Sequence, residues 1–312
     1  MVQLRQLNVS LRGPIEQPHI YPWATVLRVS TDRGDLFFKA SLPVLAHEPA
    51  LTEMLARWRP DCTADVLATD RDRGWMLTRD AGAKLRDVIA SSGDRSHWMR
   101  VLPLYAELQI QMGERLADLL AVGVPDHRLG TLPRRYENLL GDRQALRIGL
   151  DEGLSPGEYE RLLNHALRFA ELCRSLEEFD IPESLQHDDF HSGNIFVQDG
   201  RYVFFDWGDS CVAHPFFSMV VTFRVIAHEF GVEAGGPEIV RLRDAYIEPW
   251  TRVRSRSTVL EAFAIAQQVG TVCRVLTWHG VISGLEEPFR SEYGEAVPRW
   301  LRAFLSAASG QV

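Results

Sequence analysis

The order of hydrophobic and polar residues predicts a strand-rich start to the chain. Apolar and β-branched runs of strand length occur at residues 24–30, 35–40, 64–68 and 74–78. The first two are separated by Thr31-Asp32-Arg33-Gly34, and Asp and Gly in so short a link predict a β-hairpin. Residues 48–58 are predicted to form a helix, with Pro49 in its first turn, where proline is tolerated.

After the break at Arg79-Asp80-Ala81-Gly82, the hydrophobic pattern becomes helical. Leucine and methionine recur at every fourth position over residues 97–121, which predicts one face of an amphipathic helix. Ser155-Pro156-Gly157-Glu158 has the form of a capping box and predicts the start of a helix that ends near residue 178. Further helices are predicted at residues 216–230, 237–252, 257–283 and 289–308.

Strands followed by helices, without regular alternation, indicate an α+β fold. We expect two parts: a small β-rich N-terminal lobe at residues 1–80 and a larger helical C-terminal lobe at residues 81–312. The chain is long enough for each part to bury a hydrophobic core of its own.

Composition and charge exclude several classes of protein. The 312 residues are 46% hydrophobic and 24% charged, as in an ordinary globular protein. The formal net charge of −8 lies entirely beyond residue 80, where 24 basic residues stand against 32 acidic ones. An acidic chain without a Lys/Arg-rich run argues against binding to nucleic acid or to a membrane surface. No apolar run approaches the roughly 18 residues of a membrane span, and the start lacks a signal-peptide pattern, so a cytoplasmic protein is expected.

Cysteine and lysine are both scarce. The four cysteines lie far apart and form no Cys-x-x-Cys pair, so neither a zinc site nor a disulfide framework is indicated and buried free thiols are expected. Only two of the 34 basic residues are lysines, Lys39 and Lys84. Because arginine serves nearly everywhere else, a lysine inside an apolar strand suggests a specific purpose.

The most unusual segment is His187-Asp188-Asp189-Phe190-His191-Ser192-Gly193-Asn194. It runs into an apolar stretch, the turn Gln198-Asp199-Gly200 and a second apolar stretch that ends at Asp206, which together predict a hairpin. The hairpin would place Asn194 and Asp206 close together at one end. Their oxygen atoms suit a hard divalent cation such as Mg²⁺.

This pattern, His-x-Asp-x-x-x-x-Asn followed 12 residues later by an Asp, resembles the catalytic and metal loops of protein-kinase-like phosphotransferases. The amino-acid sequence of this segment is most similar to that of the aminoglycoside phosphotransferase/choline kinase branch, where the loop typically reads His-Gly-Asp-Leu-His-x-Gly-Asn. The similarity extends over about residues 20–220 in the expected order, and it implies a bilobal kinase-like fold.

The resemblance implies a nucleotide site in the N-terminal lobe. Lys39 would meet the α- and β-phosphates of ATP, and Glu48 would hold Lys39 in place, with Glu53 as the alternative partner. Thr78 and Arg79 lie in a segment similar to the hinge whose backbone holds adenine. Whether ATP or GTP is preferred is left open.

The resemblance also implies roles for the unusual segment. Asp189 would orient the acceptor hydroxyl and take its proton, and Asn194 with Asp206 would hold Mg²⁺ on the phosphates. His187 would brace the loop. His191 would contact the γ-phosphate or the acceptor, or would serve only as a loop histidine.

Two positions depart from the family pattern. The glycine-rich phosphate loop is absent, and Tyr21-Pro22-Trp23-Ala24-Thr25 stands in its place. Phe217-Ser218 occupies a position where many relatives carry an aspartate.

Three functions compete at this stage. The first is an ATP- and Mg²⁺-dependent phosphotransferase acting on a hydroxyl of a small molecule. The second is a metal-dependent phosphohydrolase that would use histidine and aspartate ligands. The third is a catalytically silent relative that binds nucleotide. For the first function, acidic residues of the helical lobe suit a cationic acceptor such as an amino sugar, an aminoglycoside or a choline-like molecule. The same residues are equally compatible with an ordinary solvated surface. They are Glu177, Glu178, Glu229, Glu286, Glu287, Glu292 and Glu295.

Overall fold

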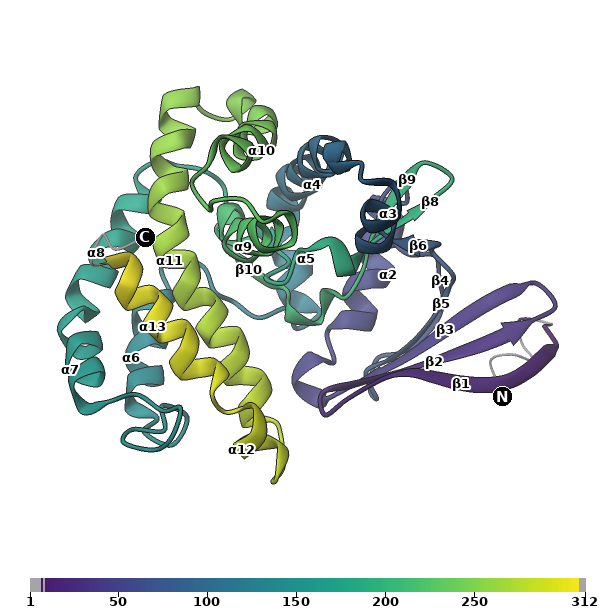
Figure 1. The fold of residues 1–312 in the computed structure, drawn as a ribbon, viewed down its shortest axis with the longest axis horizontal. Coiled ribbons are helices and arrows are strands. Elements are labelled where there is room, and N and C mark those ends of the chain that lie inside the picture. Colours follow the sequence, from purple (N-terminus) through teal and green to yellow (C-terminus); the bar gives the residue numbers. More distant parts are fainter. Residues whose placement is uncertain (1–6, 8, 309–312) are drawn as a thin grey trace. The chain divides into compact units, whose positions relative to one another are not determined.

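A computed structural model describes residues 7 and 9–308. Its largest sheet is antiparallel and has five strands in the order β1-β2-β3-β5-β4 (Figure 1). The strands are β1 Leu11–Tyr21, β2 Ala24–Thr31, β3 Gly34–Ser41, β4 Val66–Asp70 and β5 Trp75–Arg79. Helix α2, Glu48–Trp58, lies between β3 and β4 in the chain and packs against β4. The predicted hairpin, the helix and the later strands are thus confirmed within a few residues.

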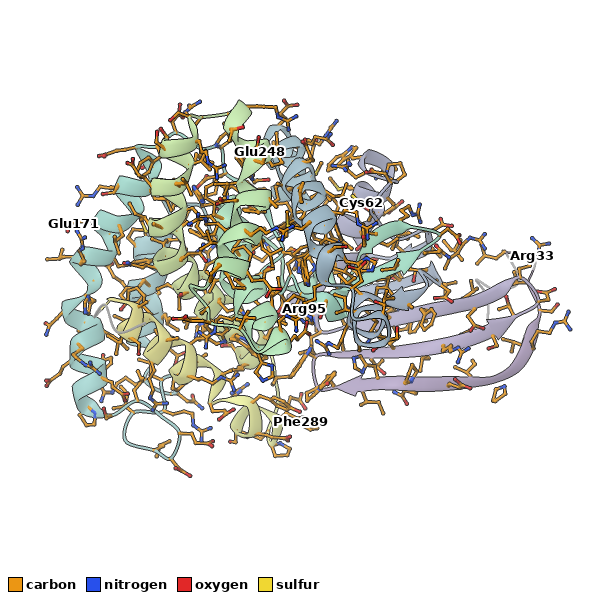
Figure 2. The ribbon with its side chains drawn as sticks, turned by 45° about the horizontal axis from the view of Figure 1, so that its top comes forward. Arg33, Cys62, Arg95, Glu171, Glu248 and Phe289 are labelled. Atoms are coloured by element: carbon orange, nitrogen blue, oxygen red, sulfur yellow. The ribbon has the colours of Figure 1, made fainter. Side chains whose placement is uncertain are left out.

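Strand β1 was not predicted from the sequence, because its pattern is interrupted by Pro14 and Pro18. It forms the edge of the sheet, where proline costs no ladder hydrogen bond. Every residue of β1 is exposed. Figure 2 shows Arg33 in the turn that joins β2 to β3.

The described residues divide into two compact units whose boundary differs from the expected one at residue 80. The first unit runs up to Arg95 and also includes residues 122–124 and 192–208, and the second contains the rest. The reason is the short sheet β6-β8-β9, formed by Ala83–Lys84, Ile195–Gln198 and Arg201–Phe204. The backbone N–H of Phe204 also donates to the carbonyl of Cys62 over 2.8 Å, which ties the late hairpin to the early chain.

The second unit is mostly helical, which confirms the α+β class. A two-stranded sheet of β7, Ser184–Gln186, and β10, Cys211–Ala213, lies among the helices. The helices are α4 Trp98–Met112, α5 Leu116–Ala121, α6 Leu132–Gly141, α7 Pro156–Asn164, α8 Ala166–Glu177, α9 Ser218–Phe230, α10 Pro237–Ile247, α11 Arg256–Ser283, α12 Phe289–Tyr293 and α13 Ala296–Ala308. The first unit contributes one more, α3 Leu85–Ser92.

Several of the predicted helices are interrupted: residues 289–308 are divided between α12 and α13, and residues 237–252 form α10 followed by a 3₁₀ turn at Glu248–Arg252. The segment 97–121 passes through a short 3₁₀ turn at Gly113–Arg115, and the segment after Ser155 breaks at His165. The capping box itself is confirmed: the Ser155 hydroxyl accepts from the N–H of Glu158, and the Glu158 side chain accepts from the N–H of Ser155. Helix α6 was missed by the sequence analysis.

Helix α11 is the central helix of the second unit and packs against α13, α8 and α6 (Figure 1). By length and composition alone it could cross a membrane, with a mean hydropathy of 1.3 over its most apolar window. However, 67% of that window is buried inside the fold, as in a core helix. Gln267, Gln268 and Arg274 divide its apolar stretches, so the sequence has no uninterrupted apolar run of about 18 residues there.

Candidate active site

Lys39 lies on the central strand β3, where its neighbours are Val26 on β2 and Met76 on β5. Its ammonium is 2.6 Å from Glu48 Oε1 and also contacts the carboxylate of Asp206. Burial by itself would lower the pKa of Lys39, but the two carboxylates outweigh it and raise the pKa above its ordinary value. The lysine is therefore held as a cation between two anions from distant segments.

Glu48 is the first residue of α2, and its side chain is almost completely buried. Burial raises the pKa of Glu48, while the charge of Lys39 opposes the rise. Its second oxygen, Oε2, accepts from the Ser41 hydroxyl over 3.2 Å. The alternative partner, Glu53, pairs instead with Arg71 at 2.8 Å, so the structure selects Glu48 as the partner of Lys39.

The hairpin β8–β9 places Asn194 and Asp206 together at its open end, as the sequence predicted. Ile195 pairs with Phe204, and one step further the N–H of Phe205 donates to the Asn194 carbonyl over 2.9 Å. Asp206 has a φ of 63°, a left-handed conformation that Asp tolerates better than most residues. Such conformations gather at functional sites.

These two residues fit a Mg²⁺ ion. Asp206 keeps 53% of its side chain exposed although one oxygen contacts Lys39, so its carboxylate can still be reached by a ligand. Carboxylate and amide oxygens are the donors that a hard cation prefers. Asn194 and Asp206 would hold the ion next to the lysine that is expected to meet the phosphates.

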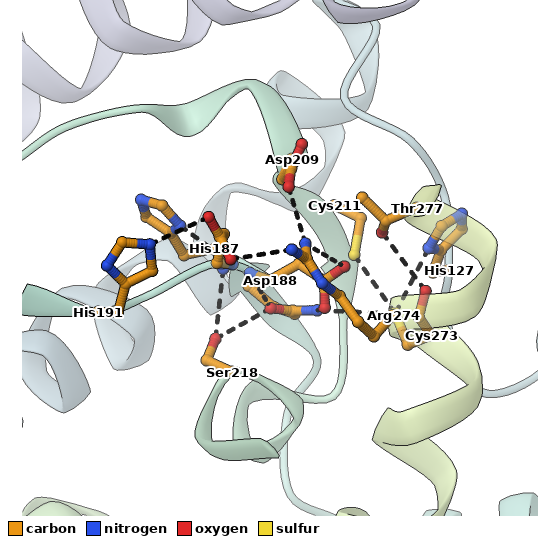
Figure 3. A network of polar contacts seen from close by, with 12 residues as sticks. His127, His187, Asp188, His191, Asp209, Cys211, Ser218, Cys273, Arg274 and Thr277 are labelled. Carbon is orange, nitrogen blue, oxygen red and sulfur yellow. Dashed lines mark hydrogen bonds and ion pairs between the residues drawn. The ribbon is translucent and has the colours of Figure 1, made fainter. Parts of the chain in front are cut away.

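Asp189 belongs to the second unit, and its side chain is 28% exposed. Arg274 Nη2 donates to Asp189 Oδ1 over 2.9 Å, and His191 Nε2 lies 3.3 Å from Oδ2 (Figure 3). Burial would raise the pKa of Asp189, but the charge of Arg274 and the His191 hydrogen bond lower it below the usual range. The carboxylate is therefore ionised and reachable at neutral pH.

Asp188 has the opposite environment. Its side chain is 1% exposed, and burial raises its pKa well above the ordinary value. It also adopts a left-handed conformation, with a φ of 60°. Of the two adjacent aspartates, Asp189 is thus the one whose carboxylate is both ionised and reachable.

Arg274 was missed by the sequence analysis. Its guanidinium also donates to Asp209 Oδ2 over 2.7 Å, lies 3.6 Å from Asp188 Oδ2 and stacks over Trp278. A single arginine in the apolar run from Val269 to Leu276 was the available signal, since a charge on a buried helix face requires a partner.

The loop that carries Asp189 is braced from within the second unit. His187 Nδ1 accepts from the N–H of Asp189 over 3.4 Å, and the N–H of His187 donates to the Tyr105 hydroxyl over 3.0 Å. Ser218 Oγ is 2.7 Å from that hydroxyl and donates to Gln186 over 3.0 Å. His187 is therefore placed as a bracing residue and His191 as a direct neighbour of Asp189.

The predicted hinge residues lie at the end of β5. Thr78 is buried and pairs with Phe37, while the exposed Arg79 forms an ion pair with Asp65 at 2.8 Å. The place of the missing glycine-rich loop is taken by a tight turn between β1 and β2, in which the rings of Tyr21 and Trp23 stack with centroids 5.1 Å apart.

The fold is that of protein-kinase-like phosphotransferases. It is similar to an ethanolamine kinase from Plasmodium vivax, with a TM-score of 0.64 and 12% identity over 96% of this chain and 84% of that one. A choline kinase from Cryptosporidium parvum gives a TM-score of 0.64 and 12% identity over 95% and 89% of the two chains. The GDP and kanamycin complex of APH(2")-IIia gives a TM-score of 0.60 and 14% identity over 100% of this chain and 98% of that one. At these identities the likeness concerns the fold.

The sequence identifies the family. The model of the phosphotransferase enzyme family matches residues 28–256, and the chain belongs to that family. This confirms the predicted resemblance and the predicted enzyme class, a phosphotransferase. A search of curated proteins found no match.

Proposed function

We propose that this protein transfers the γ-phosphate of ATP to a hydroxyl group of a small molecule, with Mg²⁺ as the metal. The observation that carries the proposal is the position of Lys39 between Glu48 and Asp206, in a chain of the phosphotransferase family. Phosphoryl transfer depends mainly on positioning and on neutralising the phosphate charge. A largely buried lysine with a raised pKa, beside a reachable carboxylate, supplies both requirements.

Each residue has a distinct task in this proposal. Lys39 would donate to the α- and β-phosphates, and Glu48 would keep its ammonium in place. Asn194 and Asp206 would hold Mg²⁺, which supplies charge neutralisation on the phosphates when it is bound. Asp189 would orient the acceptor hydroxyl and take its proton, because its carboxylate is ionised and partly exposed.

The surroundings of Asp189 argue against the alternative of a metal-dependent phosphohydrolase. The guanidinium of Arg274 contacts both Asp188 and Asp189, and it therefore lies where such an enzyme would need a metal ion between these carboxylates. Within the described part of the chain, the histidines and aspartates of residues 187–191 do not form a cluster of metal ligands.

For the acceptor, cationic amino alcohols and amino sugars are the first compounds to test. Proteins of the same fold are named as ethanolamine and choline kinases, and one was solved with kanamycin. In this chain Glu286, Glu287 and Glu292 are exposed around the end of α11. The cytoplasm is the expected compartment.

The test is ADP release from Mg-ATP across a panel of aminoglycosides, amino sugars, plain sugars and amino alcohols. We expect ADP that depends on one class of acceptor and disappears in Asp189→Ala, while that variant still binds ATP. A wild-type protein that does not bind ATP at all would refute the proposal.

A further inference from the structure

Three side chains with soft ligand atoms converge in the core of the second unit. His127, Cys211 and Cys273 are all buried, and their ligand atoms lie within 4.8 Å of one another. Cys211 Sγ is 3.7 Å from Cys273 Sγ, which in turn is 3.4 Å from His127 Nδ1 (Figure 3). Among the described residues this is the one His/Cys/Asp/Glu cluster with the geometry of a metal site.

The distances match those between ligands of a tetrahedral zinc ion. With Zn–S of about 2.3 Å and Zn–N of about 2.0 Å, tetrahedral angles place two sulfurs about 3.8 Å apart and a sulfur and a nitrogen about 3.5 Å apart. Two of the three separations, 3.7 and 3.4 Å, agree with these values, and the third, between Cys211 Sγ and the His127 ring nitrogen, is within 4.8 Å. By contrast, a disulfide requires an S–S distance of about 2.05 Å.

The three ligands come from three different elements that the backbone already holds together. Cys211 lies on β10, Cys273 on α11 and His127 in the loop before α6. The N–H of His127 donates to the carbonyl of Val212, next to Cys211, over 2.8 Å. Since the fold fixes the ligands before any ion binds, little ordering is needed on binding.

We propose that His127, Cys211 and Cys273 bind a Zn²⁺ ion as three of its four tetrahedral ligands. Binding releases to solvent the protons carried by the two thiols and by the ligating His127 nitrogen, because the metal takes thiolate and neutral imidazole ligands. The ion would fix the polar network around Asp189, since Cys273 precedes Arg274 directly and Cys211 lies two residues after Asp209. The proposal does not depend on the transferase activity.

The test uses Co²⁺ as a spectroscopic substitute for Zn²⁺ in the full chain, after reduction and treatment with a chelator. We expect one equivalent of Co²⁺ to give thiolate-to-cobalt charge transfer in the near ultraviolet and the strong visible bands of a tetrahedral site, and Zn²⁺ to abolish both. Co²⁺ at an oxygen site such as Asn194 and Asp206 would give only weak octahedral bands, so the two sites are distinguishable.

Variants assign the ligands. Cys211→Ser and Cys273→Ser should lose the charge-transfer band, and His127→Gln should weaken binding at least tenfold. Cys62→Ser, a buried cysteine of the first unit (Figure 2), is the matched control and should keep the spectrum. If the cysteine variants fail to fold, the wild-type titration decides, together with a rise in its melting temperature on addition of Zn²⁺.

Two results would overturn the proposal. The first is reduced, folded wild-type protein that shows no charge-transfer band with Co²⁺. The second is a band that persists in folded Cys211→Ser and Cys273→Ser. A Cys211–Cys273 disulfide in protein isolated without reductant, with no cobalt band after reduction, would replace the metal site by a redox pair.

Discussion

Arg274 donates from Nη2 to Asp189 Oδ1 over 2.9 Å, so a buried arginine on α11 holds the carboxylate that we assign as the proton acceptor. The same guanidinium reaches Asp209, and its own side chain is 6% exposed. A buried cation with several carboxylate partners holds them in a fixed geometry, and its charge lowers the pKa of Asp189. Arg274 is thus a positioning residue for Asp189.

Replacing Arg274 by Met should lower the free energy of unfolding by about 1.5–3 kcal/mol, because it removes charge-assisted hydrogen bonds to the part-buried carboxylates of Asp189 and Asp209. The pKa of Asp189 should also rise, because the charge of Arg274 lowers it in the native protein. The acid limb of the kcat/KM profile should therefore move to higher pH. Urea unfolding and a pH–rate profile measure the two effects.

Arg274→Lys is the companion variant. It restores one positive charge without the fork that reaches Asp189 and Asp209 together, so it should recover part of the stability and little of the rate. An unchanged acid limb in Arg274→Met would show that this arginine does not set the ionisation of Asp189.

Replacing Lys39 by Met should reduce kcat/KM for ATP by a factor of about 10²–10³, the usual effect of removing one charged group that stabilises a transition state. The ion pairs with Glu48 and Asp206 are lost together. Initial rates at varied ATP concentration measure the effect. Lys84→Met, at the only other lysine, is the control and should keep the wild-type value.

Buried histidine makes stability depend on pH. Burial lowers the pKa of His214 to about 3, against about 6.5 in the unfolded chain. The unfolded state alone binds this proton between these values, so the contribution is complete above pH 6.5 and is lost as the pH falls toward 3. In that window, His214 should make the free energy of unfolding rise by about 1.4 kcal/mol per pH unit.

The variant His214→Asn tests this slope. The asparagine oxygen can replace His214 Nδ1, which accepts from the N–H of Phe216 over 3.3 Å. Urea unfolding at several pH values should show that the free energy of unfolding depends less steeply on pH, because one fewer proton is taken up on unfolding in this window. A slope in His214→Asn equal to that of the wild type would contradict the account.

Gly82 has a φ of 92°, and a Cβ there would overlap the carbonyl oxygen of Val197 on the hairpin that carries Asp206. Gly34 has a similar φ of 97°, but its added Cβ would meet no atom within 4 Å. Both alanine variants suffer backbone strain of about 1 kcal/mol, and only Gly82→Ala adds a clash. Equal melting temperatures for the two variants would contradict this difference.

Local features of the fold were predictable, because the sequence pattern within a short window determines them. The turn at Thr31–Gly34 and the hairpin between Asn194 and Asp206 follow from strand patterns joined by short links that contain Asp and Gly. The helix interruptions at Gly113 and His165 do not change the hydrophobic periodicity, and so continuous helices were expected there.

Contacts between distant segments were not predictable in the same way. Arg274 and Asp189 lie 85 positions apart, and Cys211 and Cys273 lie 62 apart. Only tertiary packing of α11 against the strands and loops of the second unit brings these groups together. A lone charge in an apolar helix can indicate that a partner exists, but it does not say which residue the partner is.

The central claim is that phosphate moves from ATP to an acceptor hydroxyl with Asp189 as the base. Phosphorus-31 NMR of the protein with Mg-ATP and the acceptor panel tests it directly, because it separates phosphomonoester from inorganic phosphate. We predict ADP and an equal amount of phosphomonoester, falling by a factor of about 10²–10⁴ in Asp189→Asn and unchanged in the exposed turn variant Asp199→Asn. Inorganic phosphate without phosphomonoester, or full transfer by Asp189→Asn, would contradict the account.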